Sequence, residues 1–155
     1  MQFKHSQDIN APVDYVFKRM TDFPRFEGQT GKDRISFKRI GRAPIRIGTR
    51  WDISVPYKGR NRKFTAELSQ LIAPRVVSYR STSPKYQAAL SLTFTPLGAG
   101  SCRMDMLLVA QSRSFSTGMV FKTIRLARKR INRNIRTRME AIAQKLEDRY
   151  HNTDD

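Results

Sequence analysis

The sequence contains a single cysteine, two histidines and 13 acidic residues among its 155 positions. Cys102 cannot form an internal disulfide, and no second cysteine is present to build a zinc knuckle with it. Besides Cys102, only His5 and His151 could serve as soft metal ligands or as partners of a nucleophile. We therefore expect no metal and no cofactor, and we predict that Cys102 is a small buried side chain on a strand.

Long apolar runs and a secretory leader are also missing. No apolar segment approaches the roughly 20 residues that a membrane-spanning helix needs. The amino terminus lacks the basic start and the apolar block of a signal peptide, and no glycine-rich loop precedes a helix as a nucleotide cradle requires. These absences predict a soluble, cytoplasmic protein.

Positive charge, in contrast, is abundant. The chain has 30 Lys and Arg residues against 13 Asp and Glu residues, which gives a net charge of +17. The densest stretch, RLARKRINRNIRTR at 125–138, falls between Asp105 and Glu140, an interval with no acidic residue. Such an excess favours an anionic partner.

No repeat or Pro/Gly-rich linker divides the chain, so a single domain over residues 1–150 is predicted. The tail at 151–155 is acidic, and we expect it to be disordered. Residues 2–9 are a predicted strand. Asn10 is then placed to cap a short helix, and Pro24 separates this helix from a second brief one.

The spacing of apolar residues changes once along the rest of the chain. From about Arg34 to Gln111, apolar residues alternate with polar ones, as in half-buried antiparallel strands. Beyond Ser114 or Ser116 the period is helical to about Tyr150. This order predicts an α+β fold, in which a curved antiparallel sheet of about six or seven strands wraps around one long C-terminal helix, with two short helices after the first strand. The apolar stripe of the long helix comprises Val120, Ile124, Ala127, Ile131, Ile135, Met139, Ile142 and Leu146.

Three segments occur in an order known from one family: INAPVDYVFKRMTDFPRF at 9–26, GTRW at 48–51 and LTFTPLGAGSCRM at 92–104. With the long final helix they resemble the SRPBCC superfamily, in its polyketide cyclase/dehydrase-like branch. This superfamily has the helix-grip fold of START lipid-transfer domains and birch-pollen-allergen-like proteins. In the family, a Trp often follows the turn that corresponds to DFPRF at 22–26, but DFPRFEGQ at 22–29 contains no Trp here. Matches to the family's first helix and penultimate turn are Ala11, Pro12, Val16, Phe17, Pro96, Gly98 and Gly100.

The resemblance implies a deep, mostly apolar cavity between the sheet and the C-terminal helix, which members use to bind lipids, sterols, polyketides or hormones. Arg128 and Arg138 lie within the apolar stripe of that helix. Either their long stems carry the charge out to solvent, or Arg128 reaches an anionic ligand head. The predicted ligand-binding residues are Trp51, Ile53, Val55, Tyr57, Phe64, Leu68, Tyr79, Leu90, Leu92, Phe94, Met104, Met106, Arg128, Ile131 and Ile135.

The leading hypothesis is binding or transport of a hydrophobic small molecule or lipid, with docking on an anionic membrane surface as a compatible role. No catalytic residue is predicted. Asp52, Glu67 and Asp105 alternate with the apolar residues of their strands, so we expect their side chains to face solvent and not a cavity. Two alternatives stay open. One is a cyclase or dehydratase-like enzyme in which Tyr57 or Tyr79 supplies a proton, and the other is nucleic-acid binding through the basic helix. The cations predicted to contact an anionic surface are Lys122, Arg125, Lys129, Arg133 and Arg136.

Overall fold

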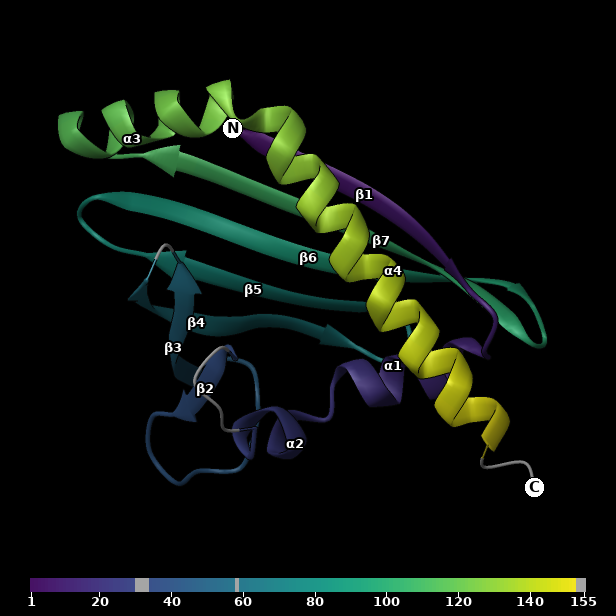
Figure 1. The fold of residues 1–155 in the computed structure, drawn as a ribbon. Helices are drawn as coiled ribbons and strands as arrows, with labels where there is room; N and C mark the ends of the chain where they lie inside the picture. The colour runs from purple at the N-terminus through teal and green to yellow at the C-terminus, as the bar shows by residue number, and fades with distance from the viewer. Residues whose placement is uncertain (30–33, 58, 153–155) are drawn as a thin grey trace.

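The computed structural model describes residues 1–29, 34–57 and 59–152. These residues form a seven-stranded antiparallel sheet with helices on one side of it, so the predicted α+β helix-grip fold is confirmed (Figure 1). The strands are β1 (Gln2–Ile9), β2 (Ser36–Arg39), β3 (Arg50–Tyr57), β4 (Arg60–Ile72), β5 (Val76–Thr82), β6 (Tyr86–Gly98) and β7 (Ser101–Ser112). The helices are α1 (Val13–Met20), α2 (Phe23–Glu27), α3 (Phe115–Leu126) and α4 (Arg128–Asn152).

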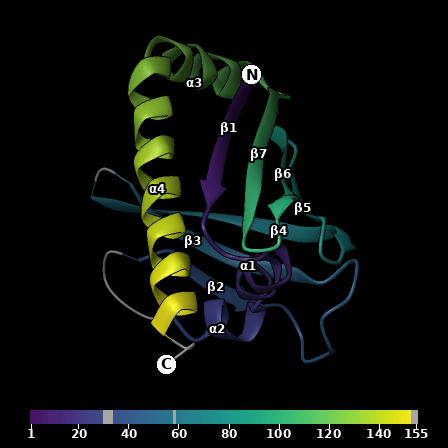
Figure 2. The ribbon, with the colours of Figure 1, turned by 90° about the vertical axis from the view of Figure 1, so that its right-hand side faces the viewer.

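Successive hairpins build the sheet from β2 to β7, and β7 then pairs with β1. The strand order is therefore β1-β7-β6-β5-β4-β3-β2. The hairpin of β6 and β7 is long, with a register from Tyr86 opposite Ser112 to Gly98 opposite Ser101. Figure 2 shows β3 and β4 crossing the direction of β1 and β7, so the sheet is strongly curved and has a concave face.

The core lies where α1 and the C-terminal part of α4 cover this concave face. Met139, Ala143 and Leu146 are the buried residues of α4, which packs against β1 and α1 (Figure 2). Phe17 of α1 meets Phe94 of β6 edge to face, with ring centroids 5.4 Å apart. Apolar burial of this kind supplies most of the driving force for folding.

The amino-terminal helix begins later than its predicted cap. Its N-cap position is Pro12, and the helix starts at Val13. The prediction that Asn10 caps it is wrong, because the Asn10 amide instead donates to the Glu147 carboxylate of α4 at 2.8 Å. Pro24 lies in the first turn of α2, where its fixed φ and missing N–H are tolerated.

The C-terminal segment is two helices, whereas the sequence predicted one continuous helix. Ser114 caps α3 by accepting from the Thr117 amide at 3.3 Å. At Ala127 the backbone leaves the helical conformation, with φ −93° and ψ 16°, and the helix axis changes direction (Figure 1). No residue of α3 is buried, so tertiary packing does not hold this part of the apolar stripe in line with α4.

An ion pair attaches α2 to the edge of the sheet. Arg39 of β2 donates from Nε to the two Glu27 carboxylate oxygens at 2.9 and 3.1 Å. The indole N–H of Trp51 lies 3.4 Å from one of these oxygens. Because the Arg39 and Glu27 side chains are only 22% and 19% exposed, solvent screens the pair less than a surface ion pair.

Replacing Phe94 by Ala tests the core. The substitution Phe94→Ala should lower the free energy of unfolding by about 3–5 kcal/mol, because it leaves a cavity against Phe17. Leu97→Ala in the same strand is the control, since Leu97 is 47% exposed and its truncation should cost no more than about 0.5 kcal/mol. Urea unfolding followed by circular dichroism measures both values, and equal losses would contradict this description of the core.

The substitution Glu27→Gln tests the attachment of α2. It should destabilise the protein by about 1–2 kcal/mol in the same urea assay, because hydrogen bonds to a partly buried charged group are lost. Glu67→Gln is the matched control. Glu67 pairs with Arg80 at 2.8 Å, but those side chains are 31% and 59% exposed, and such pairs contribute about 0–1 kcal/mol. A larger loss in the control would refute the structural role of the Glu27 pair.

Candidate ligand-binding cavity

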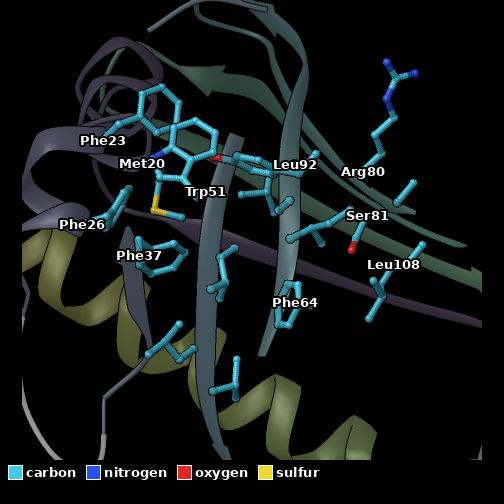
Figure 3. Close-up of a pocket in the computed structure, with 18 residues that line it drawn as sticks. Met20, Phe23, Phe26, Phe37, Trp51, Phe64, Arg80, Ser81, Leu92 and Leu108 are labelled. Carbon is cyan, nitrogen blue, oxygen red and sulfur yellow. The ribbon is translucent and has the colours of Figure 1, made fainter. Parts of the chain in front are cut away.

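A cavity of about 410 Å³ opens on the concave face of the sheet. Strands β3, β4, β5 and β6 contribute most of its lining, and α2 and β2 add side chains from one side (Figure 3). Apolar hollows of this size accommodate small organic molecules in proteins.

Strand alternation explains why apolar side chains gather in this cavity. Trp51, Ile53 and Val55 share one face of β3 because every second side chain points the same way. The register places Trp51 opposite Ala66 and Ile53 opposite Phe64, and these residues also line the cavity. The two strands thus present a continuous apolar surface to the cavity.

Aromatic rings form one side of the cavity. Phe23 of α2 lies against Trp51, with ring centroids 5.3 Å apart, and Phe26 lies 6.0 Å from Phe37 of β2. Trp51 also meets Tyr79 of β5 at 6.3 Å. Figure 3 shows Phe23, Phe26, Phe37 and Trp51 together on one side of the cavity. This side suits a flat, apolar ligand.

The polar lining side chains differ in their availability. The Ser81 hydroxyl donates to the Thr65 carbonyl at 2.6 Å and lies 3.2 Å from the Tyr86 hydroxyl. Arg80 points away from the cavity (Figure 3) and pairs with Glu67. Among the described lining side chains, this leaves the Tyr79 hydroxyl available to a ligand. Burial raises the pKa of Tyr79 above its usual value, because the phenolate would be poorly solvated. Tyr79 is therefore a protonated hydrogen-bond donor.

Asp52, Asp105 and Cys102 are not among the residues that line the cavity. Asp52 accepts a hydrogen bond from Thr65 at 3.2 Å on an exposed part of the sheet, and Asp105 accepts one from Ser6. Cys102 is fully buried; burial, with a smaller effect from the Asp8 charge, raises the pKa of its thiol to about 11. In residues 1–29, 34–57 and 59–152, no three His, Cys, Asp or Glu side chains come together as metal ligands.

The structure brings part of the predicted ligand site together in the cavity and places another part in the core. The predicted residues that line the cavity are Trp51, Ile53, Val55, Phe64, Tyr79, Leu90 and Leu92. Leu68, Phe94 and Met104 are fully buried in the core, and Met106 packs against it. Tyr57 ends β3, but its side chain lies outside the described part of the structure.

The predicted site residues of α4 are not among the cavity-lining residues. Arg128 donates from Nη2 to the carbonyl oxygen of Gln2, and its guanidinium lies 5.2 Å from the Phe3 ring centroid. Ile135 packs against the core, and Ile131 is half-buried. Arg128 is thus bound to β1, and ligand contacts of these residues stay a prediction. The cations Lys122, Arg125, Lys129, Arg133 and Arg136 are exposed.

The sequence interpretation missed the contribution of α1, α2 and β2. Met20, Phe23, Phe26, Ile35 and Phe37 line the cavity, whereas the sequence predicts for DFPRFE at 22–27 only a break at Pro24 and a second brief helix, with no ligand contact. The spacing of Phe23 and Phe26 was the available signal, since residues three apart lie on one face of a helix.

Comparison with known proteins gives a family for this fold. The model of the family described as polyketide cyclase / dehydrase and lipid transport matches residues 1–147. No match is found among the curated proteins. In the described part of the chain, no helix combines the length and the apolar character that crossing a bilayer demands.

Solved structures share the fold at low sequence identity. An aromatase/cyclase from a Streptomyces species has a TM-score of 0.66 and 16% identity, with 96% of this chain and 94% of that chain covered. Norcoclaurine synthase from Thalictrum flavum, in complex with dopamine and hydroxybenzaldehyde, has a TM-score of 0.64 and 9% identity, with coverages of 96% and 87%. A Thermus thermophilus protein has a TM-score of 0.67 and 16% identity over 100% of both chains. Because the family model matches residues 1–147 of the 155 in this chain, the chain belongs to the polyketide cyclase/dehydrase and lipid transport family of the SRPBCC superfamily.

Proposed function

We propose that this protein binds an uncharged hydrophobic small molecule or lipid in the cavity formed by the sheet, α2 and β2. The observation that carries the proposal is the lining, which combines an aromatic side with aliphatic strand residues and one available donor, Tyr79. A ligand that fills the cavity gains about 25 cal/mol for each Å² of apolar surface removed from water, less the cost of association.

The charge of the lining supports an uncharged ligand. Arg80 points away from the cavity and is paired with Glu67, so an ionised ligand group deep inside would meet no counter-ion among the described lining residues. Burying an unpaired charge is costly. Tyr79, in contrast, can donate to a carbonyl, ether or hydroxyl oxygen. The favoured ligand is therefore apolar with an oxygen acceptor near Tyr79.

Binding without catalysis is favoured over a cyclase or dehydratase activity. Such an enzyme needs a group that removes a proton from its substrate. The described lining has no carboxylate, imidazole or thiol, and the raised pKa of Tyr79 keeps its phenol protonated. Tyr79 can polarise a bound carbonyl, but it is poorly suited to act as a base.

Filling the cavity tests the location of the ligand. Ala88 is a half-buried lining residue of β6, and Ala88→Trp should weaken binding of the uncharged dye Nile red by at least about tenfold. Ala89→Trp is the matched control: Ala89 borders the cavity but is exposed, and alternation directs its side chain to the other face of the strand. Fluorescence titration measures both affinities. Equal affinities in the two variants would place the dye elsewhere.

Removing one hydroxyl tests the donor. Tyr79→Phe should weaken binding of Nile red, which carries a ring carbonyl, by about fivefold, the equivalent of a net hydrogen bond of about 1 kcal/mol. Binding of diphenylhexatriene, a hydrocarbon without an acceptor, should be unchanged. Because the phenol is protonated below its raised pKa, wild-type affinity for Nile red should be flat from about pH 6 to 9. A similar loss for both dyes would assign Tyr79 to packing alone.

A further inference from the structure

The α3 helix presents a line of apolar side chains to solvent. Phe115 is 86% exposed and Leu126 is 90% exposed, and Met119 is also exposed. Phe115, Met119, Lys122 and Leu126 follow at spacings of four, three and four residues, which places them on one face of the helix. Single exposed apolar residues are common, but a contiguous group of this kind marks an interaction surface. We call these four residues the α3 stripe.

Positive charge surrounds the α3 stripe. Lys122 lies within the stripe. Arg125 lies just before the bend at Ala127, Lys129 and Arg130 lie just after it, and all three are exposed. The chain has no acidic residue between Asp105 and Glu140, so α3 and the start of α4 contribute no negative charge. An anionic partner with an apolar layer beneath its charges complements this pattern.

We propose that α3 docks the protein on anionic phospholipid membranes. Phe115 and Leu126 would enter the boundary of the acyl chains, while Lys122 and Arg125 contact lipid phosphates. Interfacial helices gain affinity from buried apolar area together with attraction to anionic lipids. A shallow hollow of about 320 Å³ along α3 has the same mixture, since Phe115, Met119, Lys122 and Arg125 all line it.

Two other occupants fit this surface less well. A nucleic acid would neutralise the cations, but its phosphates would leave Phe115 and Leu126 in water. A second copy of this chain would cover the apolar side chains, but it would bring Lys122 and Arg125 near a surface of the same sign. A bilayer with anionic headgroups satisfies both the apolar and the basic side chains.

The position of α3 connects docking with the cavity. Ser112, the last residue of β7, pairs with Tyr86 at the start of β6, and α3 begins at Phe115, directly after this end of the hairpin. The cavity-lining residues Ala88 and Leu108 lie near this end of the two strands. Figure 1 shows α3 at this end of the sheet, away from α2. Docking through α3 therefore brings one end of the cavity toward the membrane, a consequence that rests on the proposed ligand binding.

Sedimentation with vesicles tests the docking. The protein should sediment with vesicles of equal amounts of phosphatidylcholine and phosphatidylserine, should stay in solution with phosphatidylcholine alone, and should be released by salt. The double variant Phe115→Ser with Leu126→Ser should lower the partition coefficient by at least about tenfold. Its matched control is Ile72→Ser with Leu97→Ser, two exposed apolar residues at the opposite end of the sheet, which should bind as the wild type does.

The charge contribution is tested in the same way. Lys122→Gln with Arg125→Gln should lower partition by about fivefold for each charge removed. Arg75→Gln with Lys145→Gln removes the same charge from exposed positions away from α3 and should have a smaller effect. Circular dichroism and Nile red binding without vesicles should be unchanged in the α3 variants, so a failure of docking is distinguishable from a failure of the cavity proposal.

Three outcomes would overturn the proposal. The first is equal sedimentation with both kinds of vesicle. The second is full binding by the Phe115→Ser, Leu126→Ser variant combined with competition by duplex DNA, which would assign α3 to nucleic acid. The third is a dimer, detected by light scattering without lipid, that the same variant dissociates, because α3 would then be an interface between copies of this chain.

Discussion

The concave face of the sheet presents more apolar surface than α4 covers, and the rest of the structure depends on this mismatch. The buried residues of α4 are Met139, Ala143 and Leu146, and none lies in its first eleven residues. The helix packs against β1 and α1. Strands β3 to β6 extend their apolar faces beyond this contact. Since exposed apolar surface is unfavourable, it must be covered by other elements or by a ligand.

The small elements α2 and β2 cover part of this surface and give the cavity its character. Phe23 and Phe26 reach the sheet from a helix of five residues, which is too short to be stable alone. The ion pair between Glu27 and Arg39 joins α2 to β2, and Trp51 connects both to the floor of the sheet. The aromatic side of the cavity therefore depends on contacts that lie outside the large core.

The bend at Ala127 separates a helix with no buried residue from a helix that packs on the core. Beyond the bend, α4 closes the core. Before it, α3 has no buried residue and carries exposed apolar and basic side chains on a shared face. Substitutions on α3 change the stability of the core little, so its surface is free to be selected for binding. This is the physical basis of the proposal that α3 contacts a membrane while the sheet binds the ligand.

Local sequence determined the strands, the family and much of the cavity. Alternation alone identifies Trp51, Ile53 and Phe64 as one apolar face, because the period of two in a strand is a property of the backbone. The break at Ala127 could not be predicted, since the helical period continues through it and alanine is a strong helix former. The binding of Arg128 to Gln2 and Phe3, and the meeting of Phe26 with Phe37, were decided only by the tertiary structure. Both contacts join residues from different secondary-structure elements. Whether such residues meet depends on how the elements pack, and no local sequence pattern encodes that packing.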